Sequence, residues 1–220
     1  MKLYYSNGSP FARKVRIVLH ELGVPFESDI SDQLRPADGA PGPTLSVPVL
    51  EDGGRMLWDS DVIVEYLLAT HGGGAPAGEP PLAPWLARPG QRWEDMTLLA
   101  TIASYAGSMM NLRMMQVDGI TPENSDYLAR QAARVERCLD WLEARVTPEG
   151  FVPGWFSVQD IAFVCPTVFC EVRGVMPWRG RPGLEALFDR CQRRPSMLAT
   201  AINVVPPLRP RYTVARHPAG

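Results

Sequence analysis

The sequence predicts a two-part protein, with an α/β unit first and an all-helical unit after it. Through residue 70, short apolar runs typical of strands alternate with stripes at helical spacing, whereas beyond residue 90 only helical spacing recurs. Glycine and proline crowd the stretch between these parts, as is typical of a linker. We therefore expect an α/β domain over residues 1–75, a linker over 76–90 and a helical domain over 91–220.

The opening stretch predicts a strand, a turn and a helix. Residues 2–5 form a short apolar strand and residues 6–8 a turn. Pro10 suits the first turn of a helix, because its missing N–H has no partner there, and Gly23 is expected to end that helix. The apolar stripe of the helix consists of Phe11, Val15, Val18 and Leu22. Ser9 therefore lies at a helix N-terminus just past a strand, where free N–H groups and the helix dipole favour an anion such as a thiolate.

The other elements follow from alternation and helical periodicity in turn. Further strands are expected over 26–30, from 47 to 50 and over 55–58, the last two joined by a turn at 52–54. Further helices are expected over 60–70, 91–116, 122–146, 161–168 and 184–193. Ser157 and Asp160 have the spacing of a capping box before the fourth of these helices. The polar, Pro- and Gly-rich residues 31–43 are expected to form a loop at the rim of a site.

Composition excludes several classes of function. A net charge of −2 gives no electrostatic case for a nucleic-acid or membrane partner. No apolar run approaches the roughly 18 residues that span a bilayer, and residue 2 onward lacks a signal-peptide pattern, so we expect a cytoplasmic protein. The four cysteines form no C-x-x-C pair and histidine is scarce, so no metal site is expected. The cysteines are expected to be buried thiols.

Three short motifs occur in order along the first part. They are Ser9-Pro10-Phe11-Ala12, Val47-Pro48-Val49-Leu50 and Asp59-Ser60. With the two-part pattern, they resemble the soluble glutathione S-transferases, bacterial members in particular, over roughly residues 1–205. The resemblance implies an α/β thioredoxin-like N-terminal domain plus an all-α C-terminal domain. It also implies a homodimer that uses glutathione as co-substrate against a small hydrophobic electrophile.

The resemblance assigns a role to each motif. Ser9 and Phe11 belong to the segment that meets glutathione at the start of the first helix. Pro48 is cis in the family, and the residue before it, Val47, pairs its backbone with the cysteinyl group. Asp59 and Ser60 hold the γ-glutamyl end.

Ser9 is the candidate catalytic residue. Lowering the pKa of a thiol by two units needs about 2.7 kcal/mol. A hydroxyl hydrogen bond to an anion supplies about 1.5–3 kcal/mol, and a helix N-terminus adds about 0.3–1 kcal/mol. The Ser9 hydroxyl at the helix start is therefore enough to stabilise a glutathione thiolate without a general base. The absence of cysteine here argues against chemistry through a mixed disulfide.

Other interpretations of these residues stay open. Ser9 can be a plain helix cap. Tyr5 competes for the catalytic role, because some family members use a tyrosine at the end of the first strand, and Ser6 is a third candidate. The charged residues Arg13 and Lys14 can face the anionic tripeptide, but such residues more often solvate a helix face.

The electrophile is expected to bind between the two domains. Tyr105, Met109 and Arg113 on the first long helix are the candidate pocket residues, since methionines adapt to irregular apolar ligands. Filling of the core is the alternative for the apolar members. The predicted function is conjugation of glutathione to small hydrophobic electrophiles. Its rivals are a glutathione-dependent lyase, isomerase or dehalogenase on the same fold, and a non-catalytic binding or regulatory protein.

Overall fold

The computed structural model describes residues 1–30, 42–72 and 80–202. The expected loop over 31–43 and the C-terminal tail therefore lie largely outside the described residues. The first part contains β1 (Lys2–Tyr4), α1 (Pro10–Glu21), β2 (Glu27–Asp29), β3 (Val49–Asp52), β4 (Arg55–Trp58) and α2 (Ser60–His71). The second part contains α3 (Arg92–Val117), α4 (Asp126–Glu143), α5 (Val158–Glu171), α6 (Pro182–Gln192) and α7 (Pro195–Ala199). The predicted α/β part followed by an all-helical part is confirmed.

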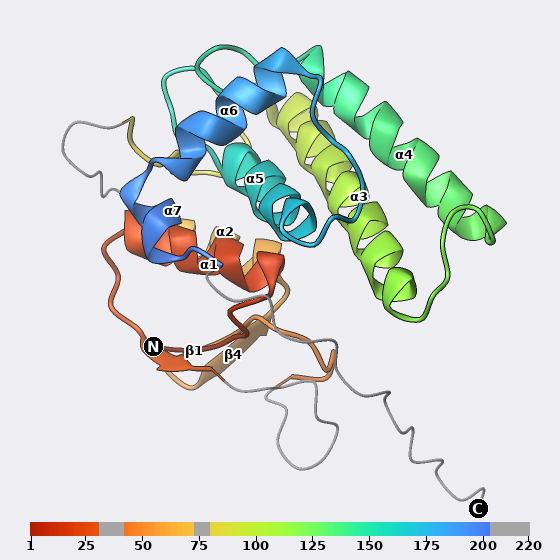
Figure 1. Cartoon of the computed structure of the whole chain (residues 1–220). Helices are drawn as coiled ribbons and strands as arrows, with labels where there is room; N and C mark the ends of the chain where they lie inside the picture. Colours follow the sequence, from red (N-terminus) through yellow and green to blue (C-terminus); the bar gives the residue numbers. More distant parts are fainter. Residues whose placement is uncertain (31–41, 73–79, 203–220) are drawn as a thin grey trace, which may run out of the picture.

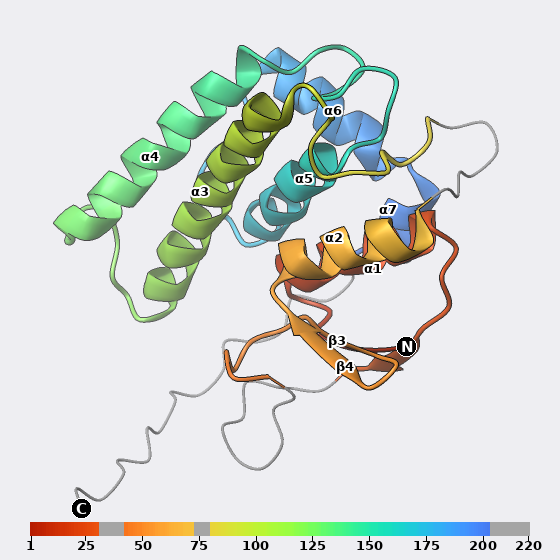
Figure 2. The ribbon, with the colours of Figure 1, turned by 180° about the vertical axis from the view of Figure 1, so that it is seen from behind.

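The strands form one mixed sheet in the order β2-β1-β3-β4. β1 runs parallel to β2 and antiparallel to β3, which pairs antiparallel with β4. Tyr4 pairs with Val49, and Val49 pairs in turn with Trp58, so these residues form one row across the sheet. Helices α1 and α2 lie together between the sheet and the helices of the second part (Figures 1 and 2).

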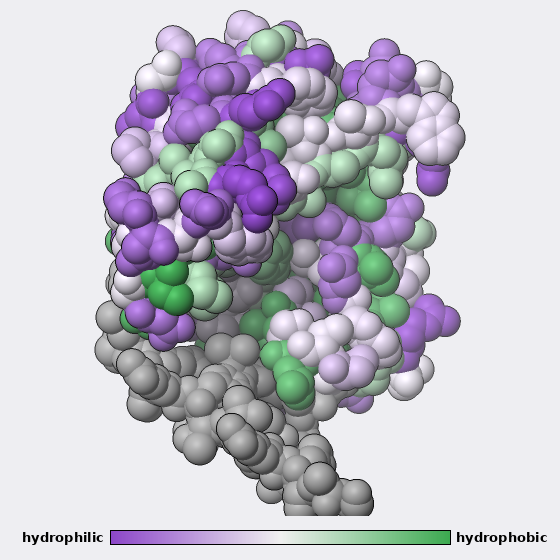
Figure 3. All heavy atoms as spheres, turned by 90° about the vertical axis from the view of Figure 1, so that its right-hand side faces the viewer, coloured by the Kyte–Doolittle hydropathy of each residue, from purple (hydrophilic) through white to green (hydrophobic). Residues whose placement is uncertain are grey.

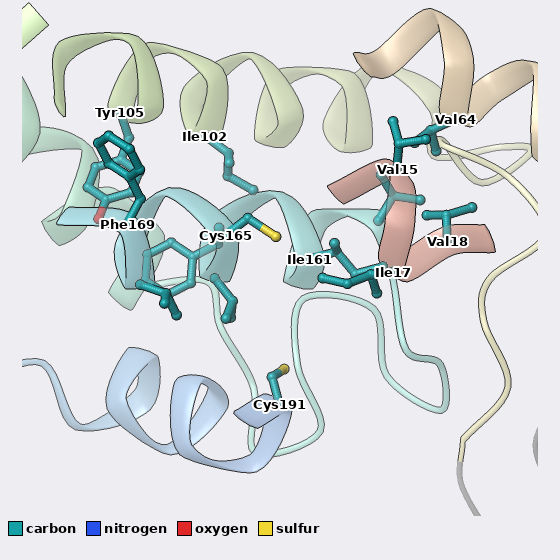
Figure 4. Close-up of a cluster of buried hydrophobic side chains, with 14 of the residues drawn as sticks. Val15, Ile17, Val18, Val64, Ile102, Tyr105, Ile161, Cys165, Phe169 and Cys191 are labelled. Atoms are coloured by element: carbon teal, nitrogen blue, oxygen red, sulfur yellow. The ribbon is translucent and has the colours of Figure 1, made fainter. Parts of the chain in front are cut away.

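α5 is the central helix of the second part and is buried on almost every side. It packs against α3 and α1, and therefore joins the two parts (Figure 4). The expected capping box starts it: Ser157 Oγ accepts from the Asp160 N–H at 3.1 Å, and Asp160 Oδ2 accepts from the Ser157 N–H at 2.9 Å. The two side chains thus satisfy backbone donors that would otherwise be buried without partners.

The start of α4 and the presence of α7 are two differences from the expectation. α4 starts at Asp126 rather than 122, because Ser125 caps it by accepting from the Leu128 N–H at 3.4 Å. Pro195 follows the helix expected over 184–193, and it begins the further short helix α7. Proline suits a first helical turn as well as it ends a preceding helix.

The prediction that Arg13 and Lys14 solvate a helix face is wrong. Arg13 is 1% exposed, and its Nη2 donates to the Met197 carbonyl of α7 at 3.2 Å. Lys14 is 5% exposed and pairs with Asp61 at 2.7 Å. α1 lies between the sheet and the second part, so even the cationic face of the helix is covered.

A buried ion pair also ties α1 to the end of the second part. Arg194 donates to both carboxylate oxygens of Glu21 at 2.7 Å, and Arg194 also donates to the Pro80 carbonyl at 2.9 Å. The Ser196 hydroxyl bonds to the same Glu21 carboxylate. Because Glu21 ends α1 and Ser196 lies in α7, this cluster fixes one part of the chain against the other.

All four cysteines are free and buried, as expected. Burial raises the pKa of Cys165 to about 11 and of Cys170 to about 12, and it raises the pKa values of Cys138 and Cys191 as well. In the part of the chain that the structure describes, no three metal-ligating side chains come together. Across the same residues, every helix is too short or too polar to cross a membrane.

Candidate active site

The register of the sheet brings three segments to one end of it. Tyr4 ends β1, Val49 begins β3 and Trp58 ends β4, and these three residues lie side by side. Ser9 follows β1 by one turn, and the residues just before β3 and just after β4 lie at the same end. The three motifs of the sequence therefore converge.

Ser9 caps α1 and retains a free donor. Its backbone is extended (φ −81°, ψ 121°), and its Oγ accepts from the Ala12 N–H at 3.2 Å. Among the described residues, nothing accepts the Ser9 hydroxyl proton, and nothing accepts the N–H of Phe11 in the first helical turn. Two donors are thus available at the positive end of the helix dipole.

The backbone of Val47 is also open to a ligand. The Val47–Pro48 peptide bond is cis, as the resemblance implied, and Pro48 is buried. The pairing of β3 with its neighbours starts only at Val49, and within the described residues neither the N–H nor the C=O of Val47 has a hydrogen-bond partner. An extended peptide can therefore pair with this residue as a strand would.

Asp59 and Ser60 form the third side at the start of α2. Asp59 adopts a positive φ of 72°, and its Oδ1 accepts from the Asp61 N–H at 2.8 Å and the Val62 N–H at 3.3 Å. Ser60 is 5% exposed, and its hydroxyl and N–H bond to no described residue. A hydroxyl and an N–H at a helix N-terminus suit a carboxylate.

A small cavity of about 40 Å³ lies beside α1, between the two parts of the chain. Its lining consists of Pro10, Phe11, Lys14, Asp61, Leu99, Ile102, Ala103, Ala106, Ala162, Cys165 and Pro166. Phe11 lines this cavity, is 37% exposed, and follows Ser9 by two residues at the start of the helix. The face of the molecule on the right of Figure 1 is hollowed near its middle, with apolar residues beside the hollow (Figure 3).

Comparisons with known proteins agree with this arrangement. The family model described as "Glutathione S-transferase, N-terminal domain" matches residues 3–78. GstB, a glutathione S-transferase of Escherichia coli, is 28% identical over 212 residues, covering 89% of this chain and 94% of that protein. The uncharacterised GST-like protein YibF of the same species is 29% identical, with 91% and 98% covered.

Solved structures extend the match to both parts of the chain. A glutathione transferase family member from Pseudomonas fluorescens Pf-5 with bound S-(propanoic acid)-glutathione has a TM-score of 0.70 and 30% identity, covering 90% of this chain and 97% of that one. This chain belongs to the glutathione S-transferase family. A glutathione S-transferase from Methylobacterium radiotolerans in complex with glutathione sulfonate has a TM-score of 0.76 and 26% identity, with 96% and 99% covered. The thioredoxin-like assignment of the N-terminal part is thus confirmed.

The two other catalytic candidates are placed differently from Ser9 in this glutathione S-transferase fold. The Tyr5 hydroxyl donates to Ser28 Oγ of β2 at 3.5 Å, and the Arg16 guanidinium lies 4.7 Å from the centre of the Tyr5 ring. β2 flanks β1 on the side away from β3, so the structure does not bring this hydroxyl to Val47 or Ser60. Ser6 is half-buried, and its carbonyl accepts from the Ser9 N–H at 3.0 Å.

None of the three candidate pocket residues on α3 lines the cavity. Tyr105 and Met109 are 0% exposed and belong to the core. The Tyr105 hydroxyl bonds to Thr167 of α5 at 2.9 Å, and burial raises the pKa of Tyr105. Neither residue lines the cavity, so both correspond to the core-filling alternative. Arg113 is half-buried, and its Nη1 donates to Gln116 Oε1 at 3.1 Å.

The residues that line the cavity from α3 carry no polar or aromatic signal of a binding site, and two of the four are alanines. Leu99, Ile102, Ala103 and Ala106 recur at helical spacing, and this stripe was visible in the sequence. Leu99, Ala103 and Ala106 lie more than a quarter turn from Tyr105 around the helix, and Ile102 lies nearer to it. The aromatic and methionine side chains that predicted a pocket belong instead to the core, as Tyr105 and Met109 show.

Proposed function

We propose that this chain transfers the thiolate of glutathione to small hydrophobic electrophiles. The observation that carries the proposal is the pair of unused donors at the start of α1, the Ser9 hydroxyl and the Phe11 N–H. They lie at the same end of the sheet as the open backbone of Val47 and the start of α2. Relatives with bound glutathione and glutathione conjugates support the same ligand.

The cysteinyl and γ-glutamyl parts of glutathione each have a partner in this arrangement. The Val47 N–H and C=O pair with the cysteinyl residue as a strand would. The Ser60 hydroxyl and N–H at the start of α2 bind the γ-glutamyl carboxylate, whose charge the helix dipole favours. The sulfur then lies at the start of α1, within reach of the Ser9 hydroxyl.

The Ser9 hydroxyl acts by stabilising charge rather than by removing the proton. The thiol of glutathione releases its proton to water, and the hydroxyl donates to the thiolate that remains. The thiolate forms a new bond from sulfur to the electrophilic carbon, and the leaving group departs with the electron pair of the broken bond. The electrophile enters beside Phe11, against the small residues of α3 and α5.

One experiment tests binding and chemistry together. The purified chain is expected to be retained on glutathione resin and to conjugate glutathione to a generic aryl halide. The absence of both retention and turnover would exclude the transferase. Retention without turnover would point to the non-catalytic binding protein.

The Ser9 assignment is tested by the pH dependence of the rate. Ser9→Ala removes about 1.5–3 kcal/mol of thiolate stabilisation, so the apparent pKa of the rate is expected to rise by about one to two pH units. Tyr5→Phe is the matched control, because it also deletes one hydroxyl at the end of β1. Its profile is expected to stay unchanged; an altered Tyr5→Phe profile with an unaltered Ser9→Ala profile would reverse the assignment.

We also propose that the chain is a homodimer. Trp93 and Met96 of α3 are 76% and 40% exposed, and a groove between α3 and α4 lies near them. Light scattering coupled to gel filtration is expected to give twice the mass of the chain. The Trp93→Glu variant is expected to have the mass of a single chain.

A further inference from the structure

The helix faces that line the cavity continue beyond it to two arginines. On α3, Ile102 and Ala106 line the cavity, and Arg113 lies two turns further along the same stripe. On α5, Ala162 and Pro166 line it, and Arg173 follows on the same stripe in the turn after the helix. Both arginines therefore lie beyond the cavity, on the continuation of the two helix faces that line it.

The two arginines also lie at similar positions along the axes of α3 and α5. α3 and α5 run in the same direction: Ile102 precedes Tyr105 just as Ile161 precedes Cys165 and Phe169 (Figure 4). The Tyr105–Thr167 hydrogen bond fixes one level between the helices. Arg113 lies eight residues past that level and Arg173 six, or about 12 Å and about 9 Å at helical rise.

Their charges act on each other. Burial lowers the pKa of Arg173, and the neighbouring positive charge of Arg113 lowers it further. The positive charges of both guanidinium groups also lower the pKa of the same thiol, that of Cys170, against the effect of burial. The two side chains therefore share one partly desolvated region.

The partners of both arginines among the described residues are neutral. Arg173 lies 3.8 Å from the centre of the Phe169 ring and donates to the Phe169 carbonyl at 3.1 Å, and Arg113 donates to the Gln116 amide oxygen. Within the described residues, no carboxylate pairs with either guanidinium. Two like charges held by neutral partners, with donors left over, are suited to an anion.

We propose that Arg113 and Arg173 together bind a carboxylate on the electrophile. The inference rests on the proposed function and narrows its substrate class to small electrophiles with an apolar reactive body and an anionic group at the far end. The apolar body lies against the small residues of α3 and α5, and the carboxylate bridges the two guanidinium groups. Both arginines are thus specificity residues rather than catalytic ones.

Kinetics with a matched pair of electrophiles test this inference. The pair is 4-chloro-3-nitrobenzoate and its neutral amide, assayed with Arg113→Gln, Arg173→Gln and the parent chain. We expect each variant to lower kcat/KM for the acid by about tenfold or more and to leave the amide within about twofold. Arg173→Lys is expected to restore part of the activity on the acid. Equal losses on acid and amide, or no loss on either, would overturn the inference.

A control variant and a second readout separate the possible causes. Arg92→Gln makes the same change at the exposed start of α3, about 30 Å away, and is expected to affect neither electrophile. The KM for glutathione is expected to stay constant. A rise in that KM with an unchanged preference for the acid would assign the arginines to the glycyl carboxylate of glutathione and overturn the inference.

Calorimetry distinguishes failure of this inference from failure of the proposed function. S-(4-carboxybenzyl)glutathione is expected to bind more tightly than S-benzylglutathione, with the difference lost in the Arg113→Gln/Arg173→Gln double variant. Equal binding of the two conjugates overturns the inference and leaves the transferase intact. Failure of both conjugates to bind overturns the proposed function and the inference with it.

Discussion

Gly150 occupies a position that no larger residue fits. Its φ is +121°, and an added Cβ would lie 2.9 Å from Asp160 Oδ1 and 3.2 Å from Arg190 Nη2. That same Asp160 oxygen accepts from the Phe151 N–H at 2.9 Å. The glycine therefore leaves room for the carboxylate that starts α5.

We predict that Gly150→Ala is much more destabilising than Gly154→Ala. Both positions have positive φ, which costs about 1–3 kcal/mol for alanine. Only Gly150→Ala also displaces the Asp160 carboxylate, which leaves buried N–H groups unsatisfied at about 1–3 kcal/mol more. Urea unfolding of the two variants measures the difference; equal losses would show that backbone strain alone matters.

A pH dependence is expected from Asp95 in the first turn of α3. Burial raises its pKa, but the side-chain and backbone hydrogen bonds from Arg88, at 2.7–2.9 Å, outweigh burial and hold the pKa below its usual range. A carboxyl group whose pKa is lowered by folding adds stability at pH values above its pKa in the unfolded state. This stability is lost as the pH falls through the pKa of the folded state. Asp95→Asn is thus expected to cost about 1.5–3 kcal/mol at pH 7. The difference from the parent chain should shrink below about pH 4; a constant difference down to pH 3 would contradict this cause.

At the scale of the element, α5 depends on its cap more than α4 does. Ser157 is 0% exposed and its cap serves a buried N–H, whereas Ser125 caps α4 at 3.4 Å near solvent. We predict that Ser157→Ala costs about 2 kcal/mol and Ser125→Ala about 0.5 kcal/mol, the two ends of the usual range for a lost cap. Thermal or urea unfolding compares them, and a larger loss for Ser125→Ala would contradict the burial argument.

Local sequence signals predicted those elements whose cause is local. The Gly53-Gly54 turn, the Ser157–Asp160 cap and the end of α1 at Gly23 each follow from a few neighbouring residues. The resemblance assigned the three motifs to one ligand, and the structure brings their segments to one end of the sheet. Features that depend on contacts with distant helices were not predicted. Tyr105 lies in the core because its hydroxyl bonds to Thr167 of α5, and Arg13 is buried because it bonds to the Met197 carbonyl of α7. No pattern within α1 or α3 contains that information.

At the scale of the whole molecule, the ion pair between Glu21 and Arg194 holds the two parts together. Glu21 is 4% exposed and Arg194 5%. We predict that Glu21→Ala and Arg194→Ala each cost about 3–5 kcal/mol, and that the double variant costs far less than the sum, because each single change leaves a buried charge. The exposed pair of Arg179 and Glu185 is the control, for which little effect is expected. Additive losses would show that the pair does not act as a unit.

The burial of all four cysteines has a practical consequence for measuring the ionisation of bound glutathione. The four cysteine thiols are buried and protonated, so the native protein should consume almost no iodoacetamide at neutral pH. After denaturation it should consume four equivalents. Any faster alkylation seen on adding the tripeptide would then come from the tripeptide. The chain can therefore serve as an unreactive background against which the ionisation of bound glutathione is titrated directly.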